Sequence, residues 1–126
     1  PTRQTWRREM IEKGTGSRLF VDAVWAYDAL LTDMEAALQK RDWLAGDNYS
    51  LADLSITSYL NRVAELQFQP MWENSRPSVT DWLSRIRARQ NFQVAIGNYP
   101  YDAYSAQMAE QGKTRWIEVQ KILEAA

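Results

Sequence analysis

One short segment, residues 47–54, constrains the fold of this chain more than any other; it reads Asp-Asn-Tyr-Ser-Leu-Ala-Asp-Leu. Ser50 and Asp53 have the spacing of a capping box, in which the hydroxyl accepts from the Asp53 backbone N–H and the carboxylate accepts from the Ser50 N–H. Tyr49 and Leu54 then occupy the positions of a hydrophobic staple. The pattern predicts that a helix begins here, and we interpret these four residues as structural.

That helix is predicted to run to about Leu66 and to lie at the centre of the fold. No charged residue occurs between Leu54 and Asn61, and small residues are spread around the helix: Ala52, Ser55, Thr57 and Ser58. A helix that is apolar or small on every side is typical of a buried position. Pro70 is expected to end this stretch.

Two amphipathic helices are expected to flank the central one. Residues 18–41 have apolar side chains at spacings of three and four, with a start signal in Ser17. Pro77 opens the second helix, whose predicted buried stripe is Val79, Trp82, Leu83 and Ile86. Because residues two apart on a helix point in different directions, its arginines are expected to form a solvated surface: Arg85, Arg87 and Arg89.

Three further patterns are also helical. Residues 3–13 are highly charged and are expected to form a short helix. Asn91 is expected to cap another short helix over residues 92–96. A last amphipathic helix is expected over residues 103–125, with Gly112 as a break near its middle. Because no β-type alternation persists, the predicted fold is all-α, a bundle of about five helices around a central buried helix.

Missing residue types exclude several kinds of chemistry. The chain has no His and no Cys, which removes the usual zinc site, the Ser-His and Cys-His nucleophile pairs, and disulfides. No acidic cluster has the spacing of a magnesium or calcium loop, so no metal is expected. The 15 Lys and Arg nearly balance 16 Asp and Glu, which argues against nucleic acid or a membrane as partner. Without a signal peptide or membrane-spanning run, we expect a cytoplasmic location.

Residues 43–54, Trp-Leu-Ala-Gly-Asp-Asn-Tyr-Ser-Leu-Ala-Asp-Leu, resemble the core of the C-terminal helical domain of soluble, cytosolic-type glutathione S-transferases, bacterial members in particular. A second landmark is a Pro, then a helix with one Trp and two Arg, and then an aromatic residue: Pro77, Trp82, Arg85, Arg89 and Phe92. The resemblance departs at residues 90–91, where Gln-Asn stands in place of a Pro found in many relatives. The family's N-terminal thioredoxin-like domain has no counterpart in these residues.

The resemblance implies a division of the chain, which is expected to form one helical domain over residues 1–126. Residues 1–16 would be the remnant of a longer helix or a short helix. Residues 17–96 would be the family-like helical core, and residues 97–126 a C-terminal helical extension.

The resemblance also implies a function. The parent enzyme would transfer a glutathione thiolate to a small apolar electrophile, with glutathione as co-substrate bound mainly by the absent thioredoxin-like domain. This chain would supply the electrophile-binding wall, with four candidate residues, Tyr59, Arg62, Val63 and Tyr104, and no catalytic residue. Alone it is expected to be inactive, and a homodimer is expected.

Two other functions stay open. Domains that resemble this one are also appended to translation factors and aminoacyl-tRNA synthetases, so the chain could be a protein-interaction scaffold module. The content of six Trp and six Tyr also permits a stand-alone carrier for an apolar ligand.

Overall fold

The computed structural model describes residues 2–98 and 102–125, which contain helices and no strand. The five longer helices are α1 (Arg3–Lys13), α2 (Arg18–Leu38), α3 (Leu51–Glu65), α5 (Pro77–Arg87) and α7 (Asp102–Glu124). Two short helices, α4 (Pro70–Glu73) and α6 (Gln90–Phe92), and two irregular turns, η1 (Gly14–Gly16) and η2 (Gln93–Gly97), connect them. The predicted all-α bundle is therefore confirmed.

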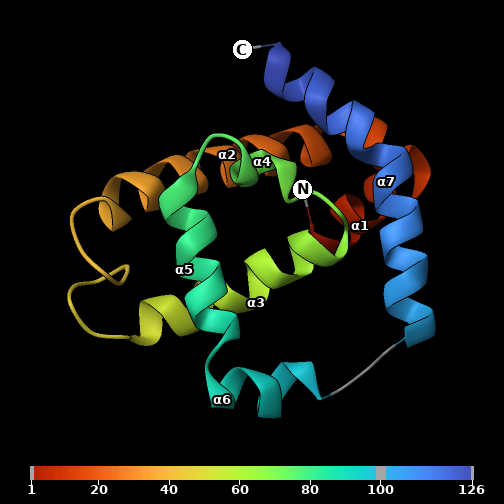
Figure 1. Cartoon of the computed structure of the whole chain (residues 1–126). Helices are drawn as coiled ribbons and strands as arrows, with labels where there is room; N and C mark the ends of the chain where they lie inside the picture. The colour runs from red at the N-terminus through yellow and green to blue at the C-terminus, as the bar shows by residue number, and fades with distance from the viewer. Residues whose placement is uncertain (1, 99–101, 126) are drawn as a thin grey trace.

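The helices cross around α3 and α5, which lie in the middle of the molecule (Figure 1). Helix α2 packs against α5 and α7, and α3 packs against α7. Helix α1 contacts the start of α2 and has no buried residue. The core between these elements is formed by one continuous group of buried side chains: Val24, Leu31, Met34, Leu60, Val63, Met71, Trp72, Val79, Trp82, Leu83, Ile86 and Val119. It includes the whole stripe predicted for α5.

Asp53 is a charged residue within this core, and its side chain is 0% exposed. Its Oδ1 accepts hydrogen bonds from the Leu44 backbone N–H at 3.0 Å and from the Trp82 indole N–H at 2.8 Å. Its Oδ2 accepts from the Ser50 N–H and the Ser50 hydroxyl, both at 2.9 Å. The capping box at the start of α3 thus also holds the loop before α3 and the middle of α5.

The net charge state of Asp53 follows from two opposing effects. Burial by itself raises the pKa of this carboxyl group, whereas the hydrogen bonds from Leu44, Trp82 and Ser50 lower it by more. The pKa of Asp53 is therefore below its ordinary value. The group is an ionised carboxylate at neutral pH, stabilised by donors from three separate segments.

The two staple positions have different surroundings. Tyr49 packs edge-on against Trp43, with ring centroids 5.3 Å apart and planes at 87°. Leu54, in contrast, is 55% exposed. The Tyr49 ring is therefore positioned by the loop before α3, and a staple contact with Leu54 stays a prediction.

Of the three arginines expected to form a solvated surface, Arg87 is exposed, whereas Arg85 on α5 and Arg89 just after it are partly buried. The Arg85 guanidinium carbon lies 4.6 Å from the Trp43 ring centroid, and that of Arg89 lies 3.8 Å from the Tyr49 centroid. These distances are within the range of cation–π contacts. Arg85 near the end of α5 and Arg89 at the N-cap of α6 therefore fasten the loop before α3 to this part of the chain.

Helix α3 is central but only half covered. Asp53, Thr57, Leu60 and Val63 are buried, which accounts for one side of the helix. On the other side the structure leaves large apolar residues open to solvent: Leu51, Leu54 and Tyr59. The prediction that α3 is buried on all sides is thus wrong, because Leu51, Leu54 and Tyr59 stay exposed on this second face.

Gly112 does not break the last helix, since α7 continues from Asp102 to Glu124. A Cβ atom built on Gly112 would lie 1.8 Å from the carbonyl oxygen of Leu66, the residue that ends α3. The glycine is therefore required by a close approach of two backbones, which a sequence pattern does not show.

Helix α3 ends in a Schellman motif, which presents Leu66 to α7. The Phe68 N–H donates to the Val63 carbonyl at 3.1 Å, and the Gln67 N–H donates to the Ala64 carbonyl at 2.9 Å. Gln67 has φ 63°, the left-handed conformation in which glycine is usual.

The expected Asn91 cap is also wrong. Helix α6 begins at Gln90, and its N-cap is Arg89, whose carbonyl accepts from the Phe92 N–H at 3.0 Å. No side chain caps this helix. The short turn is instead continued by the π-helical residues of η2.

Candidate ligand groove

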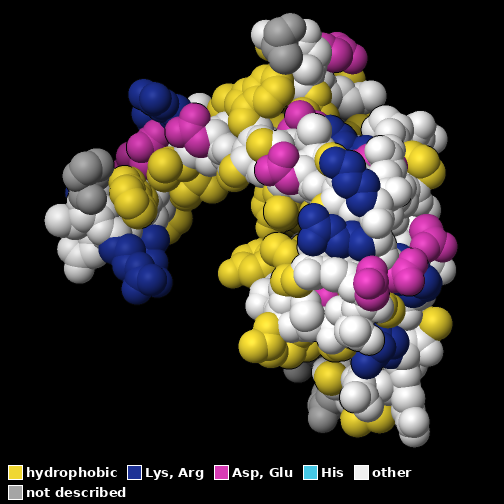
Figure 2. Space-filling view, turned by 90° about the vertical axis from the view of Figure 1, so that its left-hand side faces the viewer, with side chains coloured by type: hydrophobic (Ala, Val, Ile, Leu, Met, Phe, Trp, Pro, Cys, Tyr) yellow, Lys and Arg dark blue, Asp and Glu magenta, His cyan; other side chains and the backbone are white. Residues whose placement is uncertain are grey.

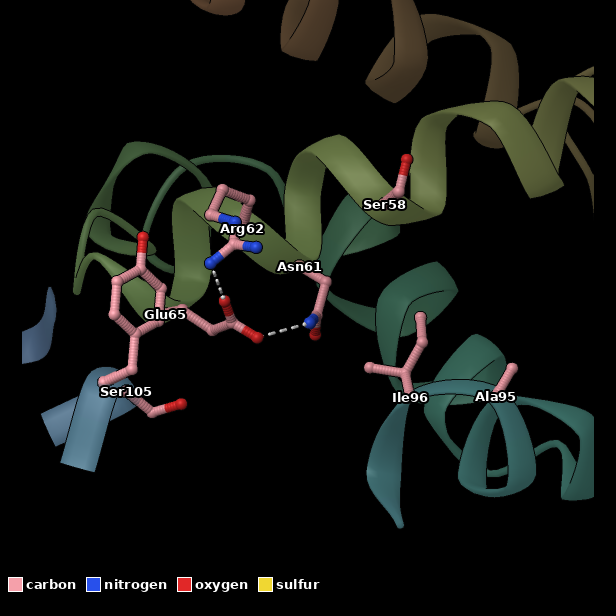
Figure 3. Close-up of a pocket in the computed structure, with 8 residues that line it drawn as sticks. Ser58, Asn61, Arg62, Glu65, Ala95, Ile96 and Ser105 are labelled. Carbon is pink, nitrogen blue, oxygen red and sulfur yellow. Dashed lines mark hydrogen bonds and ion pairs between the residues drawn. The ribbon is translucent and has the colours of Figure 1, made fainter. Parts of the chain in front are cut away.

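A groove of about 520 Å³ lies where α3, η2 and α7 meet (Figure 3). Its volume is in the range of small-molecule sites in proteins. It is lined by eight residues: Ser58, Asn61, Arg62, Glu65, Ala95, Ile96, Tyr104 and Ser105. Figure 3 shows that the charged and amide side chains come from α3, whereas Ala95 and Ile96 face them from η2.

The α3 wall follows from helical spacing. The wall begins at Ser58, and Asn61, Arg62 and Glu65 follow it by three, four and seven positions. This spacing places all four residues on one face of the helix. The core residues of α3 occupy the opposite face. Burial of the core face therefore directs these four side chains outward, toward η2 and α7.

Hydrogen bonds connect the α3 wall into a chain. The Arg62 Nη1 lies 3.0 Å from the Glu65 Oε2, and the other carboxylate oxygen accepts from the Asn61 amide at 3.0 Å. The Asn61 carbonyl oxygen accepts in turn from the Arg87 Nη2 at 3.3 Å. The groove wall thus has one guanidinium group paired with one carboxylate, and Arg87, which does not line the groove, reaches this network through Asn61.

Helix α7 supplies the facing side. Tyr104 lies in its first turn and is 58% exposed. One turn further, the Met108 sulfur accepts from the Arg62 Nη1 at 3.0 Å. This contact and the close approach at Gly112 fasten α7 to α3 and determine the width of the groove.

A second hollow, of about 310 Å³, lies between α2 and α3 on another side of α3. Its lining is almost wholly apolar: Ala23, Ala26, Tyr27, Leu30, Ile56 and Tyr59. Figure 2 shows hydrophobic side chains gathered around a hollowed face, below an arm that projects from the body. Partial burial, together with the neighbouring Tyr59, raises the pKa of the Tyr27 hydroxyl.

The four candidate residues from the sequence fall in three places. Arg62 and Tyr104 line the polar groove, and Tyr59 lines the apolar hollow. Val63 is 6% exposed and belongs to the core. Sequence reasoning missed Ser58, Asn61 and Glu65, although their spacing relative to Arg62 was a usable signal.

Among the described residues there is no group of three or more His, Cys, Asp or Glu side chains that could hold a metal ion. None of the described helices is long and apolar enough to span a membrane.

The architecture, with a capped central helix crossed by an arginine-bearing helix, defines a class of helical domain, and comparison with known proteins identifies it. A family model described as "Glutathione S-transferase, C-terminal domain" matches residues 22–90. This match includes more than half of the chain. The chain therefore belongs to the glutathione S-transferase family and corresponds to the C-terminal domain of that family.

Three curated proteins are similar to this chain. Tetrachloro-P-hydroquinone reductive dehalogenase of Sphingobium chlorophenolicum is 34% identical over 65 residues, which are 52% of this chain and 26% of that protein. Glutathione S-transferase TCHQD of Arabidopsis thaliana is 29% identical over 70 residues, 56% of this chain and 26% of that protein. Elongation factor 1-gamma 1 of Saccharomyces cerevisiae is 33% identical over 66 residues, 52% of this chain and 16% of that protein.

The similarity therefore extends over about a quarter or less of each of these relatives. No solved structure matches the chain significantly.

Proposed function

We propose that this chain is the substrate-side helical domain of a glutathione transferase, and that the parent enzyme transfers a glutathione thiolate to an electrophile. The match of residues 22–90 to the C-terminal domain of that family carries the proposal. Glutathione would be bound mainly by a thioredoxin-like domain outside this chain. The chain alone is then inactive, and the parent enzyme is a cytoplasmic homodimer.

The groove at α3, η2 and α7 would bind the electrophile. It combines an apolar wall at Ile96 with the aromatic ring of Tyr104 and the charged side chain of Arg62, which suits a ring compound with a polar substituent. One relative is named for the dehalogenation of a chlorinated hydroquinone, which agrees with a ring substrate. Tyr59 would contribute from the neighbouring hollow, and Val63 would support the wall from the core.

The proposal is tested by glutathione conjugation to 1-chloro-2,4-dinitrobenzene. The reading frame extended upstream to its natural start is assayed beside the 126-residue chain. We expect turnover by the longer protein only. Turnover by the 126 residues alone would refute the assignment of chemistry to another domain, and no turnover by either folded protein would refute the transferase.

A homodimer is tested separately, by light scattering of the extended protein over a concentration series. We expect a mass of two chains, because the apolar face with Leu51, Leu54 and Tyr59 is of the kind that drives association. A monomer at every concentration would remove this part of the proposal.

The second candidate function is a protein-interaction scaffold module. It is favoured by the similarity to elongation factor 1-gamma 1 over 66 residues. Under this alternative, the reading frame upstream of Pro1 would encode something other than a thioredoxin-like domain. The sequence of that frame therefore separates the two functions before any assay.

A further inference from the structure

The network of charged side chains at the groove does not balance. Arg62 and Glu65 line the groove as an ion pair, and Arg87, which lies outside the lining, adds a second positive charge to this network through its hydrogen bond to Asn61. Within this network one positive charge is left over. An anion that entered the groove would therefore be attracted to it.

Arg62 has donors to spare. In the described part of the chain, its contacts to the Glu65 carboxylate and the Met108 sulfur both use Nη1. A guanidinium group carries five N–H donors in a planar fork, which matches the two oxygens of a carboxylate. The side chain of Arg62 is 56% exposed, so its unused edge is accessible from the groove.

The remaining walls of the groove favour a ligand with a flat, apolar ring. Ile96 and Ala95 line the side opposite α3, and Tyr104 is on α7. Aromatic ligands gain binding free energy from offset or edge contacts with a ring such as that of Tyr104. They also gain it from the apolar area that they bury.

We propose that the groove selects small aromatic acids, with Arg62 as the contact to the acidic group and with the ring between Tyr104 and Ile96. This inference rests on the proposed function and specifies its substrate class. Glu65 restrains the site, because its carboxylate competes with the ligand for Arg62. The preference for an anion is therefore set by the Arg62–Glu65 pair.

The test compares two ligands of the same shape, 4-nitrobenzoate and neutral 4-nitrobenzamide, by equilibrium dialysis against the 126-residue chain. Glutathione is absent, so the result does not depend on transferase activity. Because a charge-assisted hydrogen bond is about twice as strong as a neutral one, we expect the acid to bind about tenfold more tightly than the amide. Equal binding of the two ligands would overturn the proposal.

Two variants locate the effect. Arg62→Gln should reduce the ratio of acid to amide affinity to about one, because the acid then loses the charge-assisted hydrogen bond that distinguishes it from the amide. Glu65→Gln should raise the affinity for the acid about threefold and leave the amide unchanged, since a competing charge is removed. An unchanged ratio in either variant would contradict the assigned roles.

Arg115→Gln is the matched control. Arg115 forms a pair with Glu118 at 2.9 Å over three positions and is 52% exposed, which closely matches the Arg62–Glu65 pair. It does not line the groove, so the ratio should stay at its original value. A similar fall in this control would show a general charge effect and overturn the site. If the extended protein is catalytically active but the tenfold preference for the acid is absent, this inference fails while the transferase proposal stands.

Discussion

Two carboxylates on α3, one near each end of the helix, have opposite surroundings. Asp53 is 0% exposed and accepts from the loop before α3, from the cap residue and from α5. The Glu65 side chain is 32% exposed, and its partners within residues 2–98 and 102–125 are two residues of its own helix, Arg62 and Asn61. A carboxylate that joins separate segments stabilises the fold, whereas one bonded to its own helix shapes a surface. The first end of α3 is thus enclosed in the core, and the second lines the groove, where we propose that a ligand binds.

The largest effect is expected from Asp53→Ala. The substitution removes the acceptor of four hydrogen bonds, those from the N–H groups of Leu44, Ser50 and Trp82 and that from the Ser50 hydroxyl, at about 1 kcal/mol each. We expect a total loss of about 4 kcal/mol in the free energy of unfolding, measured in urea. Asp47→Ala, an exposed change in the same segment, is the control and should stay within about 0.5 kcal/mol. A loss below about 1 kcal/mol would remove the contrast between the two ends of α3.

A smaller loss is expected from Gly112→Ala, which affects the junction of α3 and α7. The new Cβ would meet the Leu66 carbonyl oxygen, and backbone cannot yield as a flexible side chain does. We expect a net loss of about 2 kcal/mol, even though alanine favours a helix by about 1 kcal/mol. Thermal unfolding of Gly112→Ala beside Gln111→Ala measures this, and a stabilised Gly112→Ala would show that the helices do not approach so closely.

The third effect is a dependence on pH at Glu35, a buried carboxylate on α2. Burial raises its pKa, but hydrogen bonds from Ser78, Val79 and Gln39 lower it by more, so its folded pKa is below the unfolded one. Such a group stabilises the fold fully above its unfolded pKa, and this stabilisation is lost as the pH falls through the folded pKa.

Glu35→Gln tests this sign. We expect the variant to be about 1 kcal/mol less stable than the parent at pH 7, because the carboxylate accepts from the first turn of α5. The difference should shrink as the pH is lowered below about 4, near the unfolded pKa of a glutamate. Urea unfolding across this range measures it, with exposed Glu73→Gln as control. A difference that grows on acidification would show that folding raises, and does not lower, the pKa of Glu35.

The smallest change in stability is expected at the groove. Arg62→Gln and Glu65→Gln should each alter the free energy of unfolding by no more than about 0.5 kcal/mol, as is usual for partly exposed pairs. Urea unfolding of both variants checks this. A loss above about 1.5 kcal/mol would make the pair structural and remove the distinction from Asp53.

Local patterns predicted most of the fold. Ser17 and Ser50 both cap helices, and Pro77 occupies the first turn of α5. Caps and first-turn prolines act within four residues of the chain, so a sequence window contains all the information that they need.

The candidate site was only half predicted, because its geometry depends on contacts between distant residues. Arg62 was identified, but its contact with Met108 joins positions 46 apart in the chain. The stacking of Arg89 on Tyr49 was likewise missed, since helical spacing alone does not show which surface an arginine meets.

The sequence by itself determined where the longer helices begin, which faces are apolar and which family the chain resembles, because these depend on neighbours along the chain. Only the tertiary structure decided what Gly112 and Gln67 do, since one is required by a second backbone and the other keeps a left-handed conformation within a packed junction. It also decided that Asp53 joins three segments while Glu65 stays at the edge of a groove. The packing of helices, and not their individual patterns, determines which carboxylate is enclosed and which one can meet a ligand.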